Sequence, residues 1–207
     1  MARFGIKTGG RLGISIPQLR KIAKQTGRDH QLSLELWDTG IPEARILASM
    51  IDDPAQVTVA QSDSWVCDFN SWDICDQVCG NLFDKTPFAW EKISKWAVDE
   101  REYVRRAGYV MLACLAVHDK NAPDASFTAT FPFITAGATD PRNFVRKAVN
   151  WAIRNVGKRN LALNKAAITL SEEILAIDDK TARWIARDAL RELTGEKVQE
   201  RLRKKTK

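Results

Sequence analysis

Apolar side chains along this chain recur every three to four positions, and no stretch alternates persistently with a period of two. This spacing places apolar residues on one face of a helix, so it predicts an all-α protein without a sheet. At one predicted helix, Pro17 suits the first turn and Gly27 suits the end. The predicted helices cover 16–26, 30–38, 42–52, 56–67, 71–83, 87–98, 100–118, 125–136, 141–157, 161–177, 179–193 and 195–203.

A five-residue pattern recurs in the second half of the chain at intervals of 41 residues. Residues 103–107 read YVRRA, residues 144–148 read FVRKA, and residues 185–189 are a weaker third copy, IARDA. A period near 40 residues with two helices per unit is typical of HEAT and armadillo repeats, whose helix pairs stack to bury a continuous core. Chance similarity between amphipathic helices is the alternative, but agreement at several positions in three copies favours a true repeat. We therefore predict a superhelical solenoid of HEAT-like helix pairs, forming one domain over residues 1–207.

The two ends of the chain are expected to depart from this repeat. There is little room for a full helix pair before Ser15, so the first repeat is expected to be shortened. Residues 201–207 read RLRKKTK and are interpreted as a basic tail.

Composition narrows the class of protein. Apolar residues make up 44% and charged residues 28%, as in ordinary soluble domains. No apolar run is long enough to span a membrane, and the first ten residues lack the apolar core of a secretory signal. Four cysteines without a C-x-x-C pair, together with two histidines, are a poor supply of zinc ligands. We expect a cytoplasmic protein without a metal site, whose cysteines act as small apolar residues.

Positive charge is concentrated in the second half of the chain. Residues 1–100 hold 11 basic and 14 acidic side chains, whereas residues 101–207 hold 21 basic and 12 acidic ones. Residues 46–84 contain seven Asp but no Lys or Arg. A basic half favours a polyanionic partner such as nucleic acid, and solvated helix faces are the ordinary alternative.

The most unusual segment is residues 68–76, which read DFNSWDICD. Trp72 and Asp76 are four residues apart and therefore share one helical face. Ile74 and Val78 lie on a different stripe, which is typical of a core. The face with Trp72 and Asp76 is thus a candidate functional surface. The alternative is a buried Trp72 beside a solvated or arginine-paired Asp76.

Further basic and aromatic residues lie on two helices in equivalent positions of successive repeats, namely Arg105, Arg106, Lys147, Trp151 and Arg154. Equivalent helices of a solenoid line the same face, so these residues could converge with Trp72 and Asp76 on one concavity. Core packing of Trp151 and a structural salt bridge of Arg106 are the alternatives.

In these motifs the chain resembles the DNA alkylation repair proteins built from HEAT-like repeats, the alkylpurine DNA glycosylases. The resemblance extends from GISIPQLRKIAK to ARDALREL and includes the W-D-x-x-D segment at residues 72–76. It implies that Trp72 contacts the lesioned nucleotide and that Asp76 is catalytic. The VRRA stretch implies an active-site Arg106, with Arg105 as the alternative, and the KAVNWAIR stretch implies Trp151 as the second active-site indole.

The resemblance implies a monofunctional DNA glycosylase that hydrolyses the N-glycosidic bond of cationic N3- or N7-alkylated purines in double-stranded DNA. We expect a monomer that uses no metal or organic cofactor and does not act on a membrane. The side chains expected to contact DNA phosphates are Arg105, Arg146, Lys147, Arg154 and Lys158.

Two other functions remain open from the sequence. The chain could bind damaged or branched DNA without cleaving the glycosidic bond. It could also be a HEAT-type scaffold for protein interactions, with Trp72 and Trp151 as peptide anchors.

Overall fold

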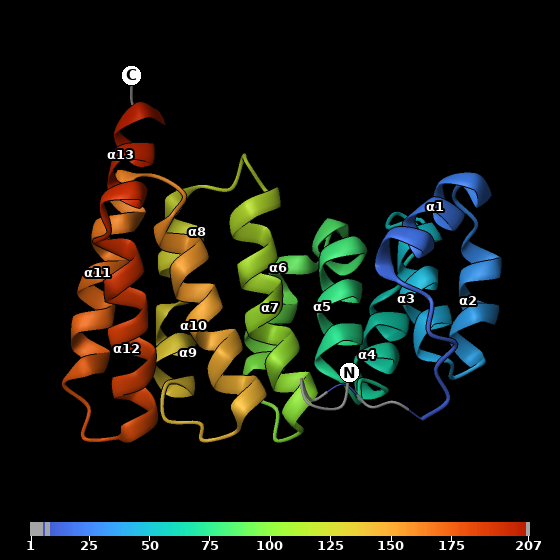
Figure 1. Ribbon diagram of the computed structural model, residues 1–207, viewed down its shortest axis with the longest axis horizontal. Helices are drawn as coiled ribbons and strands as arrows, with labels where there is room; N and C mark the ends of the chain where they lie inside the picture. The colour runs from blue at the N-terminus through green and yellow to red at the C-terminus, as the bar shows by residue number, and fades with distance from the viewer. Residues whose placement is uncertain (1–5, 7–8, 206–207) are drawn as a thin grey trace. The chain divides into compact units, whose positions relative to one another are not determined.

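The computed structural model of the chain describes residue 6 and residues 9–205, and every regular element in this part is helical (Figure 1). The predicted all-α class is therefore confirmed. Contacts within the chain divide it into two compact units, Met1–Ala89 and Trp90–Lys207. The single repeat domain over residues 1–207 stays a prediction.

The helices of the first unit are α1 (Ile16–Thr26), α2 (His30–Asp38), α3 (Pro42–Ile51), α4 (Val59–Cys67), α5 (Trp72–Asn81) and the short 3-10 helix η2 (Phe83–Lys85). The predicted ends of α1 are confirmed, because Pro17 lies in its first turn and Gly27 ends it with a φ of 78°. A positive φ is strained for other residues, so glycine suits this position.

The core of the first unit forms around α3, which packs against α1, α2 and α5. Two buried indoles, Trp37 and Trp65, stack with ring centroids 3.9 Å apart. The Nε1 atom of Trp37 donates a hydrogen bond of 2.9 Å to Asp68, so the polar edge of this buried ring is satisfied. This packing holds α4 against α2.

The helices after residue 88 are α6 (Ala89–Ala97), α7 (Glu102–His118), α8 (Asp124–Thr128), α9 (Phe131–Gly137), α10 (Asn143–Gly157), α11 (Leu161–Leu175), α12 (Lys180–Leu193) and α13 (Glu196–Lys205). The predicted single helix over 125–136 is wrong, because α8 and α9 are separate. Pro132 explains the break, since its ring has no N–H to donate and clashes with the preceding turn.

Within the second unit, α10 lies between α7 and α12 and packs against both (Figure 1). The alanines that recur in the sequence pattern, Ala107, Ala148 and Ala189, are fully buried on these three helices. Small residues allow neighbouring helices to approach closely. Gly108, which follows Ala107 on α7, lies close to the backbone of α6. A Cβ atom on Gly108 would lie 2.4 Å from the backbone nitrogen of Ala97 on α6.

The loops that precede α7 and α10 share a second pattern at the 41-residue interval, which the sequence analysis did not identify. Asp99 binds the guanidinium of Arg101, and Asp140 binds that of Arg142 in the same way. Asp140 also accepts a hydrogen bond of 2.9 Å from Arg105 on α7. Its carboxylate therefore joins one helix pair to the next.

The segment interpreted as a basic tail is helical over its described part, residues 201–205. Leu202 is fully buried, and Arg201 donates a hydrogen bond of 3.3 Å to the carbonyl of Lys158. Residues 201–205 are thus the continuation of α13, while residues 206 and 207 lie outside the described part.

Candidate functional site

The first group of candidate residues lies on α5. This helix begins at Trp72 because Ser71 is extended, with φ −156° and ψ 145°. The buried Ser71 hydroxyl donates to the side chain of Asp73 and makes no capping bond to the backbone.

The separation of two helical stripes on α5 is confirmed. Ile74 and Val78 are almost completely buried and form the core stripe. Trp72 and Asp76 are both half-buried and lie one turn apart on the other side of the helix. A partly buried indole and carboxylate on one face can contact a ligand while neighbouring side chains fix their orientation.

The neighbouring carboxylate, Asp73, has a structural partner that the sequence analysis missed. The Arg11 guanidinium lies 2.7 Å from Asp73 and 3.9 Å from Glu43, and only 7% of the Arg11 side chain is exposed. Glu43 in turn accepts hydrogen bonds from the backbone N–H groups of Leu12 and Gly13. Asp73 thus anchors the segment before α1. No motif in the sequence signals this pairing over 62 residues.

The two candidate arginines of α7 have different surroundings. Arg106 is 95% buried and donates a hydrogen bond of 2.5 Å to the backbone carbonyl of Phe144 on α10. Arg105 is half-buried and pairs with Asp140. Arg105 therefore has a structural role between repeats, whereas Arg106 is a guanidinium held at the start of α10.

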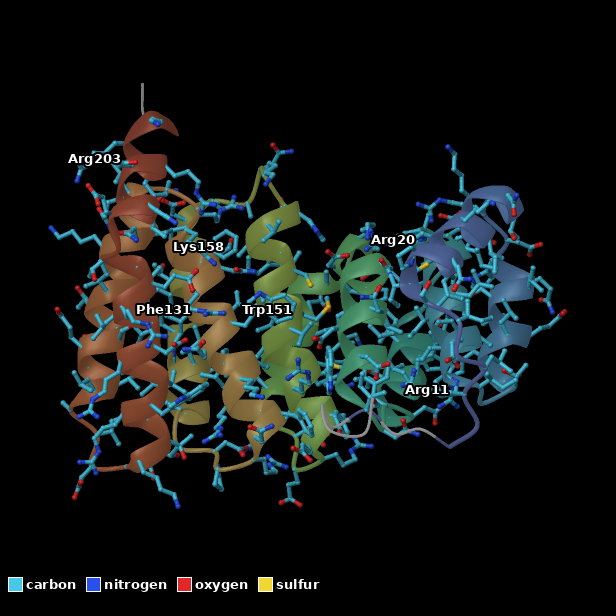
Figure 2. The ribbon with its side chains drawn as sticks, in the orientation of Figure 1. Arg11, Arg20, Phe131, Trp151, Lys158 and Arg203 are labelled. Carbon is cyan, nitrogen blue, oxygen red and sulfur yellow. The ribbon has the colours of Figure 1, made fainter. Side chains whose placement is uncertain are left out.

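The second candidate tryptophan, Trp151, lies midway along α10, and Lys158 directly follows this helix (Figure 2). Trp151 is half-buried, while Ala152 and Ile153 beside it are buried in the core. Its partial exposure is compatible with the predicted contact to a ligand. The convergence of Trp151 and Arg106 with Trp72 and Asp76 stays a prediction, because these residues are divided between the two units.

The basic residues along α10 form a stripe that faces α12. Arg154 lies 2.8 Å from Glu192, and Lys158 lies 2.6 Å from the same carboxylate. One turn before Arg154 on α10, Asn150 donates a hydrogen bond to the carbonyl of Ile185 on α12. Arg154 and Lys158, both predicted to contact phosphates, therefore also hold α10 against α12.

These ion pairs control the charge of Glu192. Burial acts to raise the pKa of this carboxyl group, but the Lys158 hydrogen bond and the positive charges of Arg154 and Lys158 outweigh it and hold the pKa below its ordinary value. A carboxylate that stays ionised locally offsets two of the cations predicted to bind DNA.

The predicted cations at the start of α10 have no such partner. The Arg146 guanidinium lies over the Trp184 ring at 4.9 Å from its centroid and donates to the Asn143 side chain. Lys147 is exposed. Neither side chain forms an ion pair within residue 6 and residues 9–205. Their charges are therefore available to an anionic ligand.

Neither a metal centre nor a membrane span can be identified in the described part of the chain. No group of three or more His, Cys, Asp or Glu side chains there could hold a metal ion. No helix there is both long and apolar enough to cross a bilayer. Cys75, Cys79 and Cys114 are buried, and Cys67 is exposed.

Comparison with known families identifies the family to which the chain belongs. A family model described as DNA alkylation repair enzyme matches residues 1–193. The chain belongs to this DNA alkylation repair family. The resemblance inferred from the tryptophan, aspartate and arginine motifs is thereby confirmed, and the match includes both groups of candidate residues.

Solved structures support the repeat architecture of this family member. One represents a new family of proteins related to the HEAT-like repeat DNA glycosylases with affinity for branched DNA structures. It is 17% identical, has a TM-score of 0.76, and is matched over 97% of this chain and 87% of that chain. The HEAT-like fold is therefore confirmed.

Two further structures match with lower similarity. An engineered protein has a TM-score of 0.44 at 13% identity, over 86% of this chain and 91% of that one. A designed armadillo repeat protein has a TM-score of 0.39 at 15% identity, over 86% and 92%. A search of curated proteins found no match.

Proposed function

We propose that this DNA alkylation repair protein is a monofunctional glycosylase for cationic N3- and N7-alkylated purines in double-stranded DNA. The observation that carries the proposal is the pairing of half-buried Trp72 and Asp76 one turn apart on α5, within a chain of this family. We also propose that the protein acts as a monomer in the cytoplasm.

The proposed substrate makes one carboxylate sufficient. An N3- or N7-alkylated purine already carries positive charge, so the base leaves without protonation by a general acid. The sugar becomes oxocarbenium-like as the bond breaks, and Asp76 would stabilise this positive charge. Asp76 would also orient or deprotonate the attacking water. Other glycoside hydrolases use paired carboxylates because their leaving groups require a proton.

The proposed selectivity for damaged purines comes from the indoles. The faces of Trp72 and Trp151 would attract a cationic nucleotide through cation–π contacts of about 0.5–2 kcal/mol each. A neutral purine would lack this attraction. Arg106 would contact a phosphate, since a guanidinium favours nearby negative charge.

The phosphate contacts are proposed to differ along α10. Arg146 and Lys147 would contact phosphates directly, because neither is ion-paired within the described residues. Arg154 and Lys158 would share their charge between DNA and Glu192. Each cation that engages a phosphate steepens the salt dependence of DNA binding.

The experiment compares release of 7-methylguanine from methylated duplex DNA by the wild-type protein and by Asp76→Asn. We expect Asp76→Asn to slow release by about 100-fold or more while duplex binding changes little, because the amide keeps the shape but loses the charge. Asp38→Asn, at an exposed side chain of the same unit, is the matched control. Unchanged release by Asp76→Asn would reject the assignment.

A second candidate function is binding of branched DNA without base release. The structural likeness to a family with affinity for branched DNA structures, at a TM-score of 0.76, is the observation that favours it. Salt-sensitive binding to a four-way junction, with no release from methylated duplex, would select this function over the first.

A further inference from the structure

A basic patch with an exposed indole at its centre lies on α12 and the adjoining start of α10. We define the α12 patch as Arg146, Lys180, Trp184 and Arg187. Trp184 is the only tryptophan among the exposed large apolar residues of the described chain, with 38% of its surface accessible. Lys180 and Arg187 lie one helical turn to either side of it, and both are exposed.

In the described chain, the cations of the α12 patch are not held in ion pairs with carboxylates. Neither Lys180 nor Arg187 is ion-paired anywhere in the part of the chain that the structure describes. Arg146 lies over the Trp184 ring, donates to the neutral Asn143 side chain and forms no ion pair within the described residues. This contrasts with the other end of the same helix pair, where Glu192 binds two cations. An anion can therefore approach Lys180 and Arg187 without displacing a carboxylate partner.

The surface beside Trp184 is hollowed. A pocket of about 380 Å³ is lined by Lys180, Arg183, Trp184, Arg187, Asp188 and Arg191. The carboxylate in this lining, Asp188, is bound by Arg191 and Arg154, so its charge is compensated. Arg183 pairs with Asp178 outside the lining. The pocket thus combines the size of a small-ligand site with an aromatic wall and surplus positive charge.

We propose that the α12 patch binds a stretch of unpaired nucleotides in DNA. One base would stack on the exposed part of the Trp184 ring, and the flanking phosphates would contact Lys180 and Arg187. Stacking on an aromatic ring combined with a positively charged surface is how proteins bind single strands without sequence preference. Arg146 lies over the ring and would keep it oriented. The inference rests on the proposed function only in taking DNA as the ligand.

An acidic peptide is a poorer fit to the α12 patch. Its carboxylates would pair with Lys180 and Arg187, but they have no aromatic face to stack on Trp184. A base supplies the flat π-face, and the phosphate on either side of it supplies the charge. A competing peptide therefore tests whether charge alone accounts for binding.

The experiment measures binding of the full chain to a fluorescein-labelled thymidine oligonucleotide of about sixteen nucleotides, which is within the range of single-strand site sizes. A blunt duplex of the same length is measured in parallel. The variants are Trp184→Ala and Trp184→Leu, the second of which keeps an apolar side chain in contact with the helix. Lys165→Ala, at an exposed cation on α11, is the control for Arg187→Ala.

We expect either Trp184 variant to weaken binding of the single strand by roughly 5- to 150-fold, because one stacked base is lost. Binding of the duplex should change by much less. Arg187→Ala should lower the slope of log affinity against log salt by about 0.7, as expected for one lost phosphate contact on a single strand. Lys165→Ala should leave that slope unchanged.

The proposal is overturned if both Trp184 variants bind the single strand like the wild type, or if poly-glutamate displaces the strand as well as unlabelled DNA does. Base release from methylated duplex is measured on the same proteins. Loss of strand binding in the Trp184 variants without any release by the wild type would reject the glycosylase and keep the α12 patch. Base release by the wild type without binding of the single strand would keep the glycosylase and reject the α12 patch.

Discussion

The carboxylate that joins consecutive repeats, Asp140, allows a quantitative prediction. Only 3% of its side chain is exposed, and it binds Arg142 in the same loop and Arg105 on α7. Burial acts to raise its pKa, but the hydrogen bonds from the two arginines outweigh it and lower the pKa from 3.8 to about 2. Because a pKa difference of one unit corresponds to about 1.4 kcal/mol, this ionised group stabilises the fold by about 2 kcal/mol.

The Asp140→Asn substitution removes this charge and should lower the free energy of unfolding by about 2 kcal/mol at neutral pH. For a chain of this length, the corresponding decrease in melting temperature is about 4–8 °C. The matched control is Asp99→Asn, one repeat earlier. Asp99 is 23% exposed and its partner Arg101 is 57% exposed, so its removal should cost less than about 1 kcal/mol.

The pH dependence provides an independent measurement. The folded carboxyl group of Asp140 binds protons less readily than the unfolded one, so its contribution is complete above the unfolded pKa of 3.8 and disappears as the pH falls toward 2. Wild-type protein should therefore lose more stability in urea titrations between pH 5 and about 3 than Asp140→Asn does. Equal losses in the two proteins, or equal destabilisation by Asp140→Asn and Asp99→Asn, would refute this account.

Two other substitutions test the packing and the charge of the second unit. Glu192→Gln should tighten binding to undamaged duplex at low salt and steepen the salt slope by up to about 2, because Lys158 loses its carboxylate partner and Arg154 keeps only Asp188. An unchanged slope would contradict this. Gly108→Ala should destabilise the protein by about 1–3 kcal/mol in urea unfolding, since the new methyl group would lie 2.4 Å from the backbone nitrogen of Ala97. Wild-type stability for Gly108→Ala would show that α6 and α7 separate readily.

Much of the fold could be predicted from the sequence because helical periodicity is a local property. The ends of α1 follow from Pro17 and Gly27, and the repeat follows from alanines that are buried at equivalent positions. The local pattern failed at 125–136, where the apolar spacing continued through Pro132 but the backbone could not. The candidate roles of Trp72 and Asp76 also came from the sequence, through their four-residue spacing and the family motif.

The partners of the charged side chains were decided only by the tertiary structure. Asp73 binds Arg11 from a distant segment, and nothing in the sequence around Asp73 signals that partner. Arg154 and Arg146 lie on one basic stripe, yet Arg154 binds Glu192 while Arg146 lies over an indole. The physical reason is that a charge interacts with whatever packing brings within a few ångströms, and sequence separation carries no information about that distance. Periodicity thus predicts which face of a helix is buried, whereas packing decides which exposed charges remain available for DNA.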